Sequence, residues 1–320
     1  MLTLEAIGIE LVVMARGTHD SVTDDRNDSI LININGELLP RDEAKISVFD
    51  SGYLVGDGIW EGLRLHKGVF VFLDDHLDRL FEGARMIFLD IGKNREELKA
   101  ALVKTVEANG MTDGAHVRLM VTRGNKKTPS QDPRLTVTPP NIVIIAEYKE
   151  ANPETKKTGV RLFTSAIRRG SPDYLDPRLN CHSKLHEVIA LTQAFHAGAD
   201  EALMLDIHGF VSTCNATNFF IVRKGEVWTS TGSYCMNGIT RAKVIEVCEK
   251  NEITVRQKDF SLLDVYGADE AFVTGTFGGL TPVSEIDHRK LPGDSLPGPM
   301  TRRLSDWYDL EIRNIVACHR

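Results

Sequence analysis

The sequence predicts an α+β protein built from two domains. Its 320 residues are about twice the length of a usual single domain. Segments typical of strands and of helices are mixed in both halves of the chain, which favours an α+β arrangement in each. A charged stretch with a proline, residues 149–158, separates the halves as a linker would. We therefore predict an N-terminal extension at 1–28, a smaller domain at 29–148 and a larger domain at 159–320.

Local patterns predict the elements of the smaller domain. The extension before it ends in a polar run, which we interpret as a flexible lead-in. Two short strands surround Asn35 and Gly36, a dipeptide typical of a hairpin turn. Apolar residues at helical spacing predict two helices, the second ended by Gly110. The predicted helices lie at 74–88 and 94–110, and the strands that follow them at 116–124 and 141–148.

The larger domain shows the same mixture of patterns. Apolar and β-branched runs predict strands, and apolar residues at three- and four-residue spacing predict helices. The strands are expected at 160–167, 202–212, 218–225 and 226–230, and the helices at 184–198 and 240–251.

Composition argues against several classes of function. The formal net charge is −7 and the pI about 5.8, so the basic surplus needed to bind nucleic acid is missing. No apolar run approaches the roughly 20 residues needed to span a membrane. The five cysteines are an odd number without metal-ligand spacing, which predicts a cytoplasmic protein in a reducing compartment and no metal site.

Two glycine-containing turns are candidates for binding an anion. Gly238, Ile239 and Thr240 lead directly into a predicted helix, whose first N–H groups and dipole attract negative charge. Gly275 and Thr276 lie in a second turn that follows a strand, and Thr276 could add a hydroxyl and an N–H to the same anion. Taken singly, each segment has an alternative explanation: a plain capped helix for the first and a tight loop for the second.

Arg79 is a third candidate for this anion site. It follows His76 by three residues and therefore shares its helix face. A guanidinium can bind a phosphate through two parallel hydrogen bonds. The alternative is a solvated helix charge, which is the commoner fate of a single arginine.

Five segments of the sequence, in order, resemble the class IV aminotransferase family (fold-type IV), which includes branched-chain and D-amino-acid aminotransferases and aminodeoxychorismate lyase. The segments are 50–64, 72–84, 199–222, 236–241 and 268–283, and the resemblance spans roughly residues 30–315. It implies a two-domain, D-amino-acid aminotransferase-like fold whose larger domain binds pyridoxal 5'-phosphate. It also implies amino acid and 2-oxo acid substrates and a homodimer.

The resemblance assigns roles to the candidate residues. Arg79, Ile239, Thr240 and Thr276 would bind the cofactor phosphate. The substrate would lie beside three further residues, which are Trp60, Arg64 and Arg118. Strand alternation places Arg118 opposite the apolar Val117 and Leu119, on a face where it could bind a substrate carboxylate. The alternative for Arg118 is a surface charge on an edge strand.

The sequence departs from the family at the Schiff-base lysine. Asn180 occupies that position, and an amide cannot form an imine. Lys184 lies four residues later, where the family often keeps a tyrosine near the cofactor ring. We predict Ser183 as a helix N-cap and Lys184 as the first helical residue, where the helix dipole would lower the lysine pKa. The alternative is that Lys184 is an ordinary surface lysine and the site is inactive.

The second departure is Thr213, which replaces the glutamate that holds the pyridine nitrogen protonated in the family. A threonine is a neutral partner and would leave the cofactor a poorer electron sink. The leading hypothesis is a pyridoxal-phosphate-dependent aminotransferase of branched-chain-like amino acids, acting through Lys184. The alternatives are a lyase of the same fold and a catalytically silent relative that binds a phosphorylated ligand.

Overall fold

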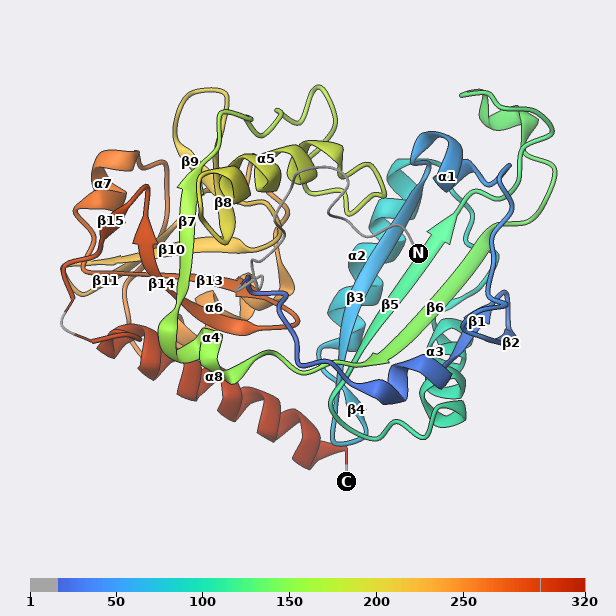
Figure 1. Ribbon diagram of the computed structural model, residues 1–320, viewed down its shortest axis with the longest axis horizontal. Coiled ribbons are helices and arrows are strands. Elements are labelled where there is room, and N and C mark those ends of the chain that lie inside the picture. The colour runs from blue at the N-terminus through green and yellow to red at the C-terminus, as the bar shows by residue number, and fades with distance from the viewer. Residues whose placement is uncertain (1–16, 294, 320) are drawn as a thin grey trace, which may run out of the picture.

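The computed structural model describes residues 17–293 and 295–319. Two β-sheets, each with its own helices, lie side by side, as Figure 1 shows. Each sheet has its own core of buried apolar side chains. The predicted two-domain α+β fold is therefore confirmed.

The N-terminal half contains an antiparallel six-stranded sheet in the order β2-β1-β6-β5-β3-β4. Helices α2 and α3 pack on one face of it, burying Leu77, Leu80, Leu98 and Leu102. Strand β3 alternates between the faces, so the opposite face is left for the larger half. The elements are η2 (Asp25–Ser29), β1 (Leu31–Ile34), β2 (Glu37–Pro40), α1 (Ser51–Val55), β3 (Gly58–His66), β4 (Val69–Phe70), α2 (Leu73–Met86), α3 (Arg95–Ala108), β5 (Ala115–Thr122), η3 (Pro133–Leu135) and β6 (Asn141–Tyr148).

The predicted hairpin and helix boundaries in this half follow local chemistry. Asn35 and Gly36 have φ angles of 56° and 95°, the left-handed values that a tight hairpin turn between β1 and β2 requires. Asn94 caps α3 through a reciprocal pair of hydrogen bonds with Glu97. Gly110 follows α3 with a φ of 64°, as expected for the end of a helix.

The C-terminal half contains a mixed nine-stranded sheet in the order β12-β11-β10-β13-β14-β7-β8-β9, with β15 paired to β14. Helix α5 lies along β7 and β8, and α6 and α8 lie against β13. The strands are β7 (Val160–Thr164), β8 (Glu201–Leu205), β9 (Val211–Cys214), β10 (Asn218–Arg223), β11 (Glu226–Thr229), β12 (Val255–Gln257), β13 (Glu270–Gly275), β14 (Gly279–Ile286) and β15 (Arg289–Lys290). The helices are α4 (Pro153–Thr158), α5 (Leu185–His196), α6 (Ile239–Lys250), α7 (Leu262–Tyr266) and α8 (Pro299–Cys318).

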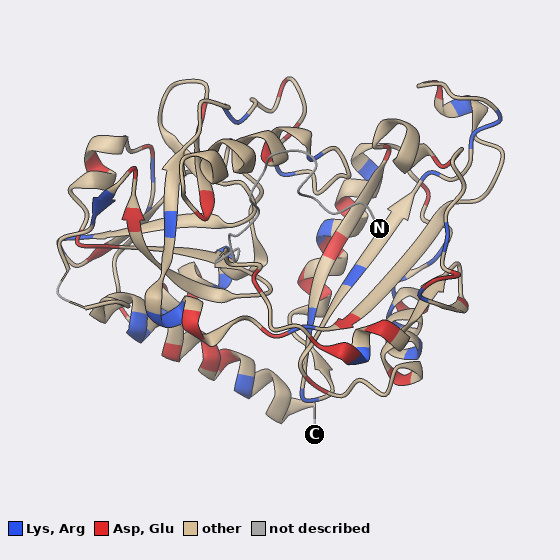
Figure 2. Cartoon of the chain, viewed as in Figure 1, with Lys and Arg blue, Asp and Glu red and all other residues tan. Residues whose placement is uncertain are grey.

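Helix α8 is the main element that the sequence predictions omit. Acidic and basic residues follow one another along its outer surface, as Figure 2 shows, and they mask the apolar pattern. Leu304, Tyr308, Ile312 and Val316 are nevertheless buried at four-residue intervals. The helix packs on α6, β13 and β14 and covers the larger sheet from below in Figure 1.

Two connecting segments also differ from the predictions. Within the expected linker, residues 153–158 form helix α4, capped by Asn152. The polar run is not a flexible lead-in where the structure describes it: Thr18 is buried, and Ser21 forms a β-bridge with Ala151. Side-chain hydrogen bonds explain the difference, because the Asp20 carboxylate accepts a hydrogen bond from the amide of Asn152. Residues 1–16 of the predicted extension lie outside the described residues.

Candidate functional site

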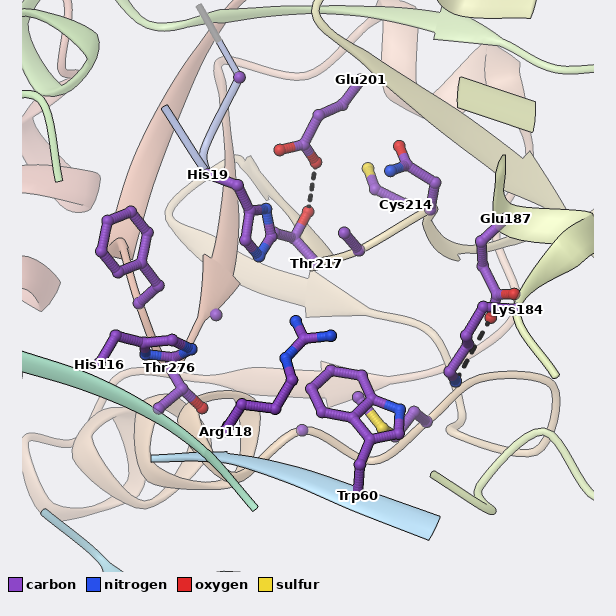
Figure 3. A pocket seen from close by; sticks show the side chains of 18 of the residues that line it. His19, Trp60, His116, Arg118, Lys184, Glu187, Glu201, Cys214, Thr217 and Thr276 are labelled. Atoms are coloured by element: carbon purple, nitrogen blue, oxygen red, sulfur yellow. Dashed lines mark hydrogen bonds and ion pairs between the residues drawn. The ribbon is translucent and has the colours of Figure 1, made fainter. Parts of the chain in front are cut away.

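A cavity of about 1020 Å³ lies between the two sheets and is lined by both halves of the chain. Figure 3 shows it from close by, with Trp60 and Arg118 below, Lys184 and Glu187 on one side and His116 on the other. Of the predicted site residues, all but Arg64 line it. The anion turns and the altered lysine segment, which are far apart in the sequence, therefore meet in one place.

The anion turns form one wall of the cavity. Helix α6 starts at Ile239 with Gly238 as its N-cap, and no side chain of the described residues caps it. Its first N–H groups therefore remain available for an anion, together with the positive end of the helix dipole. A Cβ atom at Gly238 would overlap Oδ1 of Asn218, so a larger residue would push this helix start out of position. Thr276, on the turn after β13, lines the same cavity.

Arg79 reaches this wall from α2, and most of its donors bond to the protein itself. Its Nε and Nη2 atoms donate to the carboxylate of Glu61, at 2.8 and 2.7 Å. Its Nη1 atom donates to the backbone oxygen of Asn237, just before the start of α6. Glu61 thus occupies two of the five N–H groups and Asn237 a third, so one N–H on each Nη atom remains to face an anion.

Glu61 is a fully buried carboxylate that this arrangement keeps ionised. Burial alone would raise its pKa, but Arg79 and His76 outweigh that effect and hold the pKa below its usual value. The second oxygen of the carboxylate lies 2.7 Å from Nδ1 of His76. Arg79, Glu61 and His76 therefore form a buried charged network beneath the cavity.

Asn180 is fixed against β3 by two hydrogen bonds. Its side-chain amide donates to the backbone oxygen of Trp60 at 2.6 Å, and the backbone N–H of Trp60 donates to the backbone oxygen of Asn180 at 3.0 Å. The Oδ1 atom of Asn180 is buried and has no hydrogen-bond partner within residues 17–293 and 295–319. An unpaired buried oxygen at the cavity wall is suited to accept a hydrogen bond from a ligand.

Lys184 also lines the cavity, and its place in the helix corrects the prediction. Lys184 itself is the N-cap of α5, which begins at Leu185, and the hydroxyl of Ser183 donates instead to the backbone oxygen of Gly56. Figure 3 shows the Lys184 side chain extending toward the indole of Trp60. Burial lowers the lysine pKa, and the nearby Glu187 offsets this only in part. Burial is thus the largest cause of the lowered lysine pKa.

Thr213, on β9, uses its hydroxyl within the protein. The hydroxyl donates to the backbone oxygen of Thr217 at 2.8 Å, and the amide of Asn218 lies 3.3 Å from the same hydroxyl oxygen. Thr213 can therefore offer a ligand a neutral acceptor at most.

Arg118 projects from β5 into the cavity while its neighbours Val117 and Leu119 are buried, as strand alternation predicts. Its guanidinium carbon lies 4.3 Å from the ring centroid of Trp60, a cation–π contact. Burial lowers the pKa of Arg118. Arg64 lies further along β3, on the same face as Trp60 but beyond the described lining of the cavity.

Glu201 and His19 are among the cavity residues that the sequence predictions miss. Glu201 opens the wholly buried strand β8, and its carboxylate accepts hydrogen bonds from the backbone N–H of Thr18 at 3.0 Å and from the hydroxyl of Thr217 at 2.8 Å. An acidic residue at the start of an apolar run was the available signal for Glu201. His19 stacks on Phe277 with ring centroids 6.2 Å apart, a contact between distant segments that no local pattern could indicate.

The described residues provide no membrane or metal feature. None of the helices in residues 17–293 and 295–319 has the length and apolar character needed to cross a membrane. Over the same residues, histidine, cysteine and acidic side chains do not gather into a group that could hold a metal ion.

Comparison with known proteins places this architecture among curated relatives. Branched-chain-amino-acid aminotransferase-like protein 1 of Arabidopsis thaliana is 40% identical over 282 residues, covering 88% of this chain and 50% of that protein. The chain thus spans about half the length of that relative. D-alanine aminotransferase of Listeria innocua is 34% identical over 288 residues, covering 89% of this chain and 96% of that protein.

Solved structures and a family model agree with these similarities. A branched-chain amino acid aminotransferase from T.th., solved with pyridoxamine 5'-phosphate, superposes with a TM-score of 0.83 at 30% identity, covering 89% of this chain and 94% of that one. Residues 58–286 match the family model for amino-transferase class IV. The chain therefore belongs to the class IV aminotransferase family, whose members depend on pyridoxal 5'-phosphate, and it has that family's fold.

Proposed function

We propose that the protein is an aminotransferase of branched-chain-like amino acids, with Lys184 as the lysine that bonds to pyridoxal 5'-phosphate. The observation that supports this proposal most is that Lys184 and the uncapped start of α6 line one cavity. The amide of Asn180, which holds the position of the usual lysine, cannot form this bond. The similarity to aminotransferases named for branched-chain substrates supports the substrate class.

The residues present fit the phosphate end of this cofactor. The helix start at Gly238, Ile239 and Thr240 offers N–H groups, and Thr276 and Arg79 border the same space. The unpaired Oδ1 atom of Asn180 gives this cavity an acceptor for a hydrogen-bond donor as well. When bound, pyridoxal phosphate stores the amino group and withdraws electrons from the substrate's α-carbon.

Lys184 is the better of the two cavity lysines for bonding to the cofactor. The other, Lys149, lies over the ring of Phe277, 5.1 Å from its centroid. Lys184 belongs to the same segment as Asn180 and reaches toward Trp60, whose backbone Asn180 binds. Its lowered pKa increases the fraction of neutral amine near pH 7, and only the neutral amine attacks a carbonyl.

The substrate is proposed to bind on the face of the smaller sheet that lines the cavity. Trp60 offers an aromatic surface, Arg118 offers a charge for the substrate carboxylate, and Met120 and Ile145 add apolar surface for a branched side chain. Arg64 stays a weaker candidate for a substrate contact, because it lies beyond this lining.

A homodimer is proposed because the resemblance to the class IV aminotransferases implies one, and an exposed apolar surface on α5 supports it. Helix α5 exposes Leu185, Val188 and Ile189, which are 70%, 57% and 42% accessible. Adjacent exposed apolar side chains of this kind mark interaction surfaces. Light scattering at micromolar concentration should give about twice the chain mass of 35.6 kDa, and a monomer would contradict the proposal.

Amino transfer tests the proposed function directly. The cofactor-loaded protein is mixed with L-leucine, L-valine or D-alanine and a 2-oxo acid acceptor, and formation of the new 2-oxo acid is measured. We expect turnover with the branched L-amino acids, loss of turnover in Lys184→Arg, and no change in Lys250→Arg on the outer end of α6. The paired change Asn180→Lys with Lys184→Tyr, which rebuilds the usual arrangement, should retain turnover.

Two outcomes would favour the alternatives. A protein that binds the cofactor but shows no amino transfer with any donor, even as the rebuilt pair, would favour a silent relative. Repeated release of pyruvate and ammonia from serine without an acceptor would favour a lyase, because the β-hydroxyl can leave as water. The neutral Thr213 is a lesser handicap for that reaction.

A further inference from the structure

The amine of Lys184 lies in a cluster of charged side chains at the start of α5. Its Nζ atom is 3.6 Å from Oε1 of Glu187, one helical turn further on, as the dashed line in Figure 3 marks. Glu187 is buried and lines the same cavity as Lys184. The pair therefore lies at the proposed reaction centre, away from the outer helix surface.

The carboxylate of Glu187 is itself firmly held. Nη1 of Arg169 donates to its Oε1 atom at 2.7 Å, and Nδ1 of His186 lies 3.0 Å from its Oε2 atom. Arg169 is fixed in turn by the backbone oxygens of Tyr234 and Pro177. The anchor of this cluster is therefore a buried arginine on the loop after β7, and Lys184 is the member with the longest contact.

The charges around Lys184 oppose one another. Burial lowers the lysine pKa and Arg169 lowers it further, whereas Glu187 and the Cys181 thiol act to raise it. Burial alone would raise the pKa of Glu187, but His186, Lys184 and Arg169 lower it to about 2. Glu187 is thus a fixed negative charge at any ordinary pH.

We propose that Glu187 is the positioning residue of Lys184. It directs the amine into the cavity and sets how readily that amine holds a proton when it is not bonded to the cofactor. The assignment rests on the proposed role of Lys184. Without Glu187, the amine would lose the one carboxylate that it contacts among the described residues and would keep the nearby positive charge of Arg169.

The proton affinity of Lys184 can be measured in the cofactor-free protein. The lysines are reductively dimethylated with isotope-labelled formaldehyde and a borane reductant. The signal missing from Lys184→Arg then identifies Lys184 in an NMR pH titration. We expect Glu187→Gln to lower the proton affinity of Lys184 by about tenfold, as loss of an opposite charge within 4–6 Å does. Glu187→Asp keeps a charge for Arg169 and should show a smaller decrease, which provides the measurement if the glutamine variant does not fold.

A matched control exists on α6. Lys243 and Glu246 form a pair with the same spacing, 3.1 Å apart, beyond the described lining of the cavity. Glu246→Gln should shift only the Lys243 signal and leave Lys184 unchanged. In the loaded enzyme, the acid limb of the kcat profile should move to lower pH in Glu187→Gln, with the aspartate variant in between.

The two hypotheses fail in different ways. A Lys184 signal that titrates alike in the wild type and in both Glu187 variants overturns the positioning role of Glu187, whatever the cofactor binds. A cofactor adduct on another lysine overturns the proposed function, whether or not Glu187 sets the proton affinity of Lys184.

Discussion

Arg79→Ala should separate two tasks that this residue performs at once. The guanidinium donates twice to the buried Glu61 and once to the backbone oxygen of Asn237, and its remaining N–H groups are proposed to bind the cofactor phosphate. Removing it leaves a carboxylate that is 1% exposed with His76 as its remaining partner. Breaking a buried ion pair in this way costs about 3–5 kcal/mol of folding free energy. Losing one charged hydrogen bond to phosphate costs about 1.5–3 kcal/mol, which is roughly 10- to 150-fold in cofactor affinity.

Two assays measure these losses independently. Urea unfolding of the cofactor-free protein gives the stability change, and cofactor titration of the folded variant gives the affinity change. The paired variant Glu61→Gln with Arg79→Met should recover much of the stability but none of the affinity, because it removes both buried charges. A variant that loses affinity at unchanged stability would refute the structural role of the ion pair. Unchanged affinity would refute the phosphate role.

The same network predicts the pH dependence of stability. The folded pKa of Glu61 is lowered, since Arg79 and His76 outweigh burial. Its ionisation therefore stabilises the fold fully above the unfolded pKa of about 4.3. That stabilisation is lost as the pH falls through the lower folded pKa. The stability difference between the wild type and Glu61→Gln should thus shrink in acid, and a constant difference would contradict the assignment.

Two further variants test the cavity walls. Gly238→Ala should displace the start of α6, because the new Cβ atom would overlap Asn218. A titration should show weaker cofactor affinity, while circular dichroism shows that the helices stay folded. Unchanged affinity would mean that the phosphate lies elsewhere. Thr213→Glu should speed the half-reaction with an amino donor, because a carboxylate stabilises a protonated ring nitrogen. The buried charge should cost several kcal/mol of folding stability. A folded, cofactor-loaded variant that is no faster in single-turnover spectra would refute the electron-sink hypothesis.

Much of the fold could be predicted because its signals are local. The Asn35–Gly36 turn and the Asn94 cap act within a few residues, so the structure confirms the hairpin and α3. Helix α8 carries an equally local signal at Leu304 and Tyr308, but the charged residues around them, among them Arg303, Asp306 and Asp309, obscure that spacing.

The contacts within the site could not be predicted in the same way. Arg79 lies at the cavity wall, but two of its donors are taken by Glu61, which lies on a different element. By contrast, Glu187 follows Lys184 by three residues, a spacing at which helical side chains meet, so this pair was open to prediction. The hydrogen bond from Arg169, on a separate loop, to the same carboxylate was not. Family resemblance identified positions such as Asn180, whereas the partner of each side chain depends on long-range packing.

The residue that bonds to the cofactor is the point on which the proposed function depends most directly. The loaded protein is reduced with borohydride and digested, and the modified peptide is identified by mass spectrometry. We predict a single pyridoxyl adduct on Lys184, absent from Lys184→Arg. An adduct on Lys149 or any other lysine, or a fully loaded protein without an adduct, would contradict the central claim.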